Sequence, residues 1–123
     1  MAKKILLIED EKILAEMYRD KIVKAGFSLV WSSTAEEGLM FAKKEKPDLI
    51  ILDILLPQGN GIYFLKKVRE DPDTSSIPVI AFSNFDDPKI KKEAFELGVK
   101  DYLIKTNYTP QDIIDKINYY LNL

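Results

Sequence analysis

The stretch IILDILLPQGNG, residues 50–61, decides the fold class and points to the functional site. Its first half is an apolar run typical of a strand that is buried on both faces of a parallel sheet. Its second half contains the Pro, Gly and Asn residues of a turn. Asp53 stands inside the apolar run. Because an ionised carboxylate in such surroundings is costly unless it is paired or coordinated, we expect other groups to compensate for its charge.

Short apolar runs alternate with longer amphipathic stretches along the whole chain. The predicted strands cover residues 5–8, 28–31, 49–52, 79–82 and 102–104. A helix is predicted after each strand, because apolar residues recur there at helical spacing. Thr34, Pro88 and Pro110 mark the starts of three of these helices. Five strand–helix pairs predict an α/β fold with a doubly wound, five-stranded parallel sheet that is covered on both faces.

Length and composition exclude several classes of function. A chain of 123 residues is of the size of one domain, and we expect a single domain over residues 1–123. Eighteen Lys and Arg against twenty Asp and Glu predict no direct binding to nucleic acid. The sequence has no Cys and no His, which excludes disulfides, thiol nucleophiles and histidine-based sites. The apolar run at residues 5–8 is too short for a signal peptide or a membrane span, so we expect a cytoplasmic protein.

Polar residues follow the ends of the predicted strands. Right-handed crossovers place these ends at one edge of the sheet. If the strand order is 2-1-3-4-5, the first and third strands adjoin at the switch point, where ligands bind. The polar residues at this edge are Glu9, Asp10, Asp53, Ser83 and Lys105. One lysine cannot balance three acids at close range, and oxygen ligands without His or Cys favour Mg²⁺. Each residue alone also fits an ordinary role at a helix start, in a loop or in solvent, but their convergence predicts a site.

The sequence resembles the receiver domains of two-component response regulators over essentially its whole length. The motifs LLIEDE (6–11), IILDILLPQGNG (50–61), VIAFSN (79–84) and DYLIK (101–105) occur in the order and spacing of that family. The resemblance implies a flavodoxin-like fold with strand order 2-1-3-4-5 and five helices. It also implies a signalling domain that catalyses only its own phosphoryl transfer and dephosphorylation, and is not otherwise an enzyme.

By this resemblance Asp53 would be the phosphoacceptor, taking a phosphoryl group from the phosphohistidine of a sensor histidine kinase or phosphotransfer protein. Glu9 and Asp10 match the acidic pair that holds Mg²⁺, Asp10 directly and Glu9 through water. Asp53 itself and the backbone carbonyl of Leu55 would be further ligands. The ammonium group of Lys105 would bind phosphoryl oxygens, which fits a reaction that depends on positioning and on neutralising charge.

The same resemblance implies a conformational switch. Ser83 matches the hydroxyl that contacts the phosphoryl group, and Tyr102 matches the aromatic residue that then turns inward. Phosphorylation would change the surface formed by the fourth helix, the fifth strand and the last helix. A downstream protein or an output domain would bind to that surface, and two copies of the chain could form a dimer through it. Phe95 fits either this partner face or a scattered surface position.

Four positions depart from the family pattern. One is Asn60, which replaces the common Asp before Gly61, and either residue can cap the helix that follows. Thr106 follows Lys105 where the family usually has proline, often after a cis bond. A non-proline cis bond costs roughly 2.5–4 kcal/mol, so we expect a trans bond with a shift in the aim of Lys105. Leu55 and Phe85 flank the acceptor at positions where polar side chains can orient the attacking water. We therefore predict that the aspartyl phosphate is hydrolysed slowly.

Other functions fit part of the pattern. A receiver-like scaffold that docks partners without phosphorylation remains open, chiefly because of Thr106. A hydrolase of the haloacid dehalogenase type needs a second aspartate two residues after the nucleophile, where this chain has Leu55. A flavin carrier would need a phosphate-binding loop where the chain has residues 9–11, all acidic.

Overall fold

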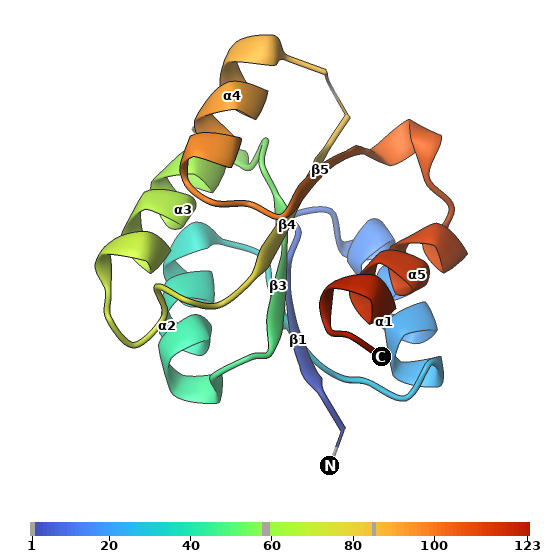
Figure 1. The fold of residues 1–123 in the computed structure, drawn as a ribbon. Helices are drawn as coiled ribbons and strands as arrows, with labels where there is room; N and C mark the ends of the chain where they lie inside the picture. Colours follow the sequence, from blue (N-terminus) through green and yellow to red (C-terminus); the bar gives the residue numbers. More distant parts are fainter. Residues whose placement is uncertain (1, 58–59, 85) are drawn as a thin grey trace.

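The computed structural model describes residues 2–57, 60–84 and 86–123. Strands and helices alternate along the chain as predicted (Figure 1), and each strand is one residue longer than expected. The strands are β1 (Lys4–Ile8), β2 (Ser28–Ser32), β3 (Leu49–Asp53), β4 (Val79–Ser83) and β5 (Asp101–Ile104). The helices are α1 (Lys12–Lys24), α2 (Ala35–Glu45), α3 (Asn60–Glu70), α4 (Pro88–Glu96) and α5 (Pro110–Tyr120), with a 3₁₀ turn η2 (Lys105–Asn107) before α5.

The five strands form one parallel sheet in the order β2-β1-β3-β4-β5. The predicted strand order is therefore confirmed. β1 and β3 are neighbours, with Ile8 paired to Leu52, and β3 pairs with β4 so that Asp53 lies beside Phe82. Because all strands run in the same direction, their carboxyl ends lie at one edge, and the switch point falls between β1 and β3.

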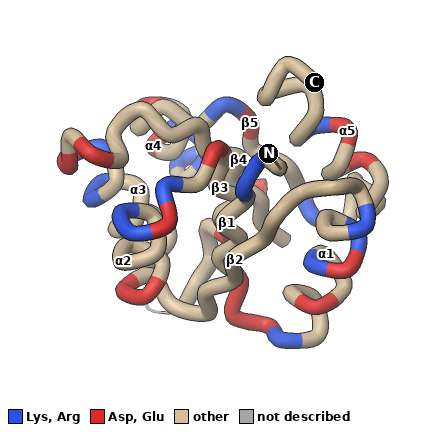
Figure 2. Tube along the Cα trace, turned by 90° about the horizontal axis from the view of Figure 1, so that it is seen from below, with Lys and Arg blue, Asp and Glu red and all other residues tan. Residues whose placement is uncertain are grey.

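Helices cover both faces of the sheet (Figure 1): α1 and α5 lie on one side, and α2, α3 and α4 on the other. Alternate residues of β1 supply the two cores, with Ile5 and Leu7 facing α1 and α5, and Leu6 and Ile8 facing the opposite layer. Charged residues lie mainly along helices and loops, while the central strands carry few (Figure 2). Within the described residues, no helix is long and apolar enough to cross a membrane.

The helix ends follow the local signals of the sequence. The Thr34 hydroxyl accepts a hydrogen bond from the Glu37 N–H at 3.1 Å and so begins α2. Thr109 and Asp112 form a reciprocal capping box at the start of α5. Gly26 and Gly98 follow α1 and α4 with φ angles of 98° and 83°, which glycine adopts without steric cost. The helix starts predicted at Thr34, Pro88 and Pro110 are therefore confirmed.

The side chain of Arg69 fastens α3 to its neighbours. Its Nε donates to the Leu97 carbonyl at 2.8 Å, and its two terminal nitrogens donate to the carbonyls of Ile77 at 2.8 Å and Gly98 at 3.3 Å. These carbonyls belong to the C-terminal end of α4 and to the segment that enters β4. One guanidinium thus binds backbone carbonyls of two segments. It fixes the C-terminal end of α4, which lies away from the carboxyl edge of the sheet.

A polar cluster joins β5 to α5. The Asp101 carboxylate accepts hydrogen bonds from Lys116 Nζ at 3.0 Å and from the Tyr120 hydroxyl at 2.8 Å. Partial burial opposes the ionised form of Asp101, but the bonds from Lys116 and Tyr120 outweigh it and lower the pKa of Asp101. In the same cluster, burial first and the hydrogen bond to Asp101 second raise the pKa of Tyr120 to about 12.

Replacing Asp101 with asparagine is expected to lower the free energy of unfolding by about 1 kcal/mol near neutral pH. Because folding lowers the pKa of Asp101, its stabilisation is present above its ordinary pKa of 3.8 and is lost as pH falls through the lowered value. Urea unfolding of both proteins, measured from about pH 7 to about pH 3, should show the difference shrinking. The control is Asp115→Asn, because Asp115 is an exposed residue of α5. This substitution should change the free energy of unfolding little at any pH. A difference for Asp101 that stays constant with pH would contradict this account.

Candidate functional site

Acidic side chains meet at the carboxyl edge of the sheet. Glu9 and Asp10 follow β1, and Asp53 ends β3. One carboxylate oxygen from each of these three residues lies within 4.8 Å of the other two. Glu9 and Asp53 are buried, whereas Asp10 is exposed. The predicted proximity of the three acids is therefore confirmed, and two of them lie in surroundings where a bare negative charge is costly.

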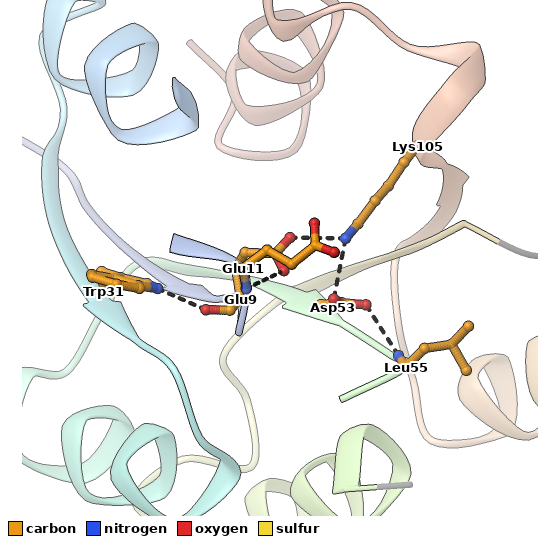
Figure 3. Close-up of polar contacts among 6 residues, drawn as sticks. All are labelled: Glu9, Glu11, Trp31, Asp53, Leu55 and Lys105. Atoms are coloured by element: carbon orange, nitrogen blue, oxygen red, sulfur yellow. Dashed lines mark hydrogen bonds and ion pairs between the residues drawn. The ribbon is translucent and has the colours of Figure 1, made fainter. Parts of the chain in front are cut away.

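Lys105 lies between two of these acids (Figure 3). Its Nζ donates to Glu9 Oε1 at 2.8 Å and to Asp53 Oδ2 at 3.1 Å. The ammonium group also lies 4.8 Å from the centroid of the Phe82 ring, on β4. Only 7% of the Lys105 side chain is exposed. The residue that follows β5 thus reaches across β4 to the ends of β3 and β1, at short range and away from water.

The electrostatics of the cluster show an excess of negative charge. Burial raises the pKa of Glu9 to about 7, and the charge of Asp53 adds to this rise while the hydrogen bond from Lys105 opposes it. For Lys105, burial disfavours the ammonium form, but Glu9 and Asp53 outweigh it and raise the pKa of Lys105 above its ordinary value. Lys105 therefore stays protonated, and one positive charge faces three carboxyl groups.

Backbone groups of the adjoining loops hold the two buried carboxylates in place (Figure 3). The Leu55 N–H donates to Asp53 Oδ1 at 3.1 Å, and the Glu11 N–H donates to Glu9 Oε2 at 3.2 Å. The indole N–H of Trp31, on β2, donates to the backbone carbonyl of Glu9 at 2.8 Å. The sequence reasoning missed Glu11 and Trp31 as parts of the site. The sequence predicts Trp31 only as part of the strand at residues 28–31, since nothing near it in the sequence indicates its partner.

Ser83 and Tyr102 lie beside the acidic cluster. Ser83 ends β4, one residue beyond Phe82, and is fully buried. Tyr102 lies in β5 with 6% of its surface exposed. Burial raises the pKa of the Tyr102 hydroxyl, and an interaction with Ser83 works against this rise. The hydroxyl therefore points inward rather than into solvent, and the aromatic ring is already buried in this conformation.

The donor set fits a hard divalent cation. All three acidic groups offer carboxylate oxygens, which Mg²⁺ prefers to nitrogen or sulfur ligands. Two buried acids and one exposed acid leave the cluster open on the side of Asp10. The pKa of Glu9 is raised first by burial and then by the Asp53 charge, so Lys105 does not fully offset the cost of burying the ionised Glu9 beside Asp53. A cation at this position would remove the remaining repulsion.

Comparison with known proteins agrees with the fold. Residues 5–118 match the sequence model of the response regulator receiver domain. The chain belongs to this family. The receiver domain is 33% identical over 113 residues to the alkaline phosphatase synthesis transcriptional regulatory protein PhoP of Bacillus subtilis (strain 168), covering 92% of this chain and 46% of that protein.

A second relative of the receiver domain is the KDP operon transcriptional regulatory protein KdpE of Escherichia coli (strain K12), 37% identical over 101 residues, or 82% of this chain and 44% of that protein. The chain thus spans about half the length of these curated relatives. Among solved structures, the CheY-like receiver domain protein from Methanospirillum hungatei JF-1 superposes with a TM-score of 0.91 over 99% of this chain and 95% of that one. At 23% identity, that likeness shows a shared fold.

The structure places most of the positions where this receiver domain departs from the family pattern. The Lys105–Thr106 peptide is trans, as expected, and no cis bond occurs among the described residues. Lys105 nevertheless reaches both Glu9 and Asp53 from the first position of η2. Leu55 is 36% exposed near Asp53, while Phe85 lies outside the described residues. Phe95 is exposed on α4, which agrees with either of its two interpretations.

Proposed function

We propose that residues 1–123 form one receiver domain that acts as a phosphorylation-operated switch, with Asp53 as the phosphoacceptor. The observation that carries the proposal is the buried Asp53 carboxylate, held 3.1 Å from Lys105 Nζ and grouped with the carboxylates of Glu9 and Asp10. The phosphoryl donor would be the phosphohistidine of a sensor histidine kinase or phosphotransfer protein. The readout would be a downstream protein or an output domain.

The chemistry proposed for Asp53 is the formation of an acyl phosphate. A carboxylate oxygen of Asp53 forms the new bond to phosphorus while the phosphorus–nitrogen bond of the donor breaks. The bonding electrons remain on the imidazole nitrogen, which takes up a proton from solvent. Lys105 is placed to exchange its contact with Asp53 for a phosphoryl oxygen, and the Ser83 hydroxyl is placed on the neighbouring strand end to donate to another.

Four groups of the chain would hold Mg²⁺: the carboxylates of Glu9, Asp10 and Asp53 and the backbone carbonyl of Leu55. The bound ion would supply positive charge that offsets the charge of the transferred group. Of these groups, Leu55 also orients Asp53 through its N–H at 3.1 Å. The loop that follows β3 would thereby align the nucleophile and complete the donor set.

The proposed switch uses the inward position of Tyr102. When Ser83 binds the phosphoryl group, the space beside Ser83 favours the buried position of the Tyr102 ring over an exposed position. Since the ring is already buried here, phosphorylation would shift the populations of two existing states. The surface of α4, β5 and α5 would then change its affinity for a partner, including a second copy of the chain.

Incubation with Mg²⁺ and a small acyl-phosphate donor tests the proposal. Intact-mass measurement should find one phosphoryl group per chain, and chelation of the metal with EDTA should prevent its attachment. A protein that gains no phosphoryl group under either condition acts as a phosphorylation-independent scaffold, and the proposal fails. Turnover of a phosphate ester without an accumulating adduct would indicate a hydrolase instead.

Replacing Leu55 with asparagine is expected to speed hydrolysis of the aspartyl phosphate severalfold. The wild-type side chain is apolar and partly exposed beside Asp53, so it cannot orient an attacking water molecule, whereas an amide can. The decay of the adduct is followed by intact mass after removal of the donor. Leu55→Met, which keeps an apolar side chain on the same backbone, is the control. Equal or slower decay in the asparagine variant would refute the explanation.

A further inference from the structure

The side chain of Trp31 completes the hydrogen bonding of the strand end that carries the acidic pair (Figure 3). Pairing between β1 and β2 ends at Ile8 and Ser32, and the Glu9 N–H still donates to the Ser32 carbonyl at 3.0 Å. The Glu9 carbonyl then accepts the Trp31 indole N–H at 2.8 Å. We infer that Trp31 is a positioning residue of the proposed magnesium site, acting through the Glu9–Asp10 peptide.

This peptide links two of the three residues whose carboxylates form the acidic cluster. Its carbonyl is held by the indole, and the N–H on the other side of Glu9 is held by β2, so the backbone on both sides of the Glu9 side chain has a fixed direction. The Glu11 N–H, just beyond, donates to Glu9 Oε2 at 3.2 Å. The orientation of the Glu9 carboxylate thus depends on the path of the loop, and the indole constrains that path.

The indole itself is held by packing. Trp31 is half-buried and packs with the apolar group between the sheet, α1 and α5, which includes Leu14 and Tyr18 of α1. A tryptophan whose ring is held in this way loses little conformational freedom when its N–H binds a carbonyl. Without that donor, the Glu9 carbonyl would bind water, and the loop into α1 would turn more freely.

This inference rests on the proposed function, since it concerns affinity for Mg²⁺ at the same acids. Groups that orient metal ligands from outside the coordination shell typically change affinity by about 10- to 100-fold when removed. Because Trp31 acts on the backbone and leaves the carboxylates in place, we expect about a tenfold weaker Kd for Mg²⁺ when the N–H is lost.

The test uses the fact that Trp31 is the only tryptophan of the sequence. Replacing tryptophan throughout the full chain with β-(3-benzothienyl)alanine therefore changes this position alone, keeping the ring shape and removing the N–H. Calorimetric titration with magnesium chloride should show the tenfold weaker Kd, and Trp31→Phe should show at least the same loss. Val30→Ala removes apolar packing from the same strand on its other face and should lower the unfolding temperature without changing the Kd.

A second measurement follows the indole N–H of Trp31 directly. The wild-type protein has a single indole N–H resonance, which should exchange slowly with solvent and shift during the magnesium titration with the calorimetric midpoint. An unchanged Kd in the folded benzothienyl variant, or a rapidly exchanging indole N–H, would overturn the role of Trp31 while leaving the proposed function intact. Wild-type protein that binds no Mg²⁺ would overturn both.

Discussion

Asp53→Asn protein is expected to gain no phosphoryl group from an acyl-phosphate donor under conditions in which the wild-type protein gains one. The amide keeps the size of the side chain and an oxygen that accepts from the Leu55 N–H, but it has no ionised oxygen to attack phosphorus. It also removes one of the three acidic ligands of the cluster, so the affinity for Mg²⁺ should fall. Intact mass measures the first effect and calorimetric titration the second.

The matched control is Asp48, at the opposite end of β3 from Asp53. Asp48 precedes β3 and accepts a hydrogen bond from the Lys4 N–H at 2.8 Å, away from the acidic cluster. Asp48→Asn should lose some stability and keep full phosphorylation. Modification of Asp53→Asn to the wild-type extent would show that another residue is the acceptor.

Lys105→Met is expected to lower the free energy of unfolding by about 3 kcal/mol at about pH 8 in the presence of EDTA. The substitution leaves two buried carboxylates, Glu9 and Asp53, without the cation that bonds to both at 2.8 and 3.1 Å. Breaking a buried pair by removing one partner is costly because the remaining charge has lost its compensation. Urea unfolding measures the loss, and intact mass measures the slower phosphorylation that should accompany it.

Acid and magnesium should each reduce this loss. The pKa of Glu9 is already raised to about 7 in the fold, so its protonated form stabilises the folded state at low pH, and that benefit disappears as pH rises through 7. The deficit of Lys105→Met should therefore shrink towards about pH 5. The Mg²⁺ proposed for this cluster should also reduce the deficit, because loss of the Lys105 charge strengthens binding of the ion to the folded variant relative to the folded wild type.

Lys116→Met is the control for loss of a lysine. Lys116 pairs with Asp101 at 3.0 Å, but 34% of its side chain is exposed, and such pairs contribute about 1 kcal/mol or less. This variant should keep full phosphorylation and lose little stability. A Lys105→Met protein as stable as the wild type at about pH 8 without metal would contradict the buried network.

Local sequence was enough to predict the elements and their order. Apolar periodicity, the hydroxyl of Thr34 and the proline of Pro88 depend on residues only a few positions apart, and the structure confirms the elements that they predict. Alternation and the handedness of the connections predicted only a parallel sheet whose strand ends share one edge, whereas the strand order was implied by the resemblance to receiver domains. One end of each strand was misplaced by one residue, because the outermost pairing depends on the neighbouring strand.

The acidic cluster was predictable for the same reason, since parallel strands bring their carboxyl ends to one edge. The contacts that hold each group of the cluster in place could not be predicted from the sequence. The Lys105–Glu9 bond joins residues 96 positions apart, and the Trp31–Glu9 bond joins residues 22 positions apart. The burial of Glu9, and with it the raised pKa, appears only when the strands and helices are packed together.

The sequence by itself determined the strand–helix alternation, the helix caps and the acids at the strand ends, because these depend on interactions between near neighbours in the chain. Only the tertiary structure decided which oxygen Lys105 binds, that Tyr102 lies inward, and that an indole from β2 supports the acidic pair. Each of these depends on the register and packing of distant segments, which bring polar groups within bonding distance and exclude water from between them.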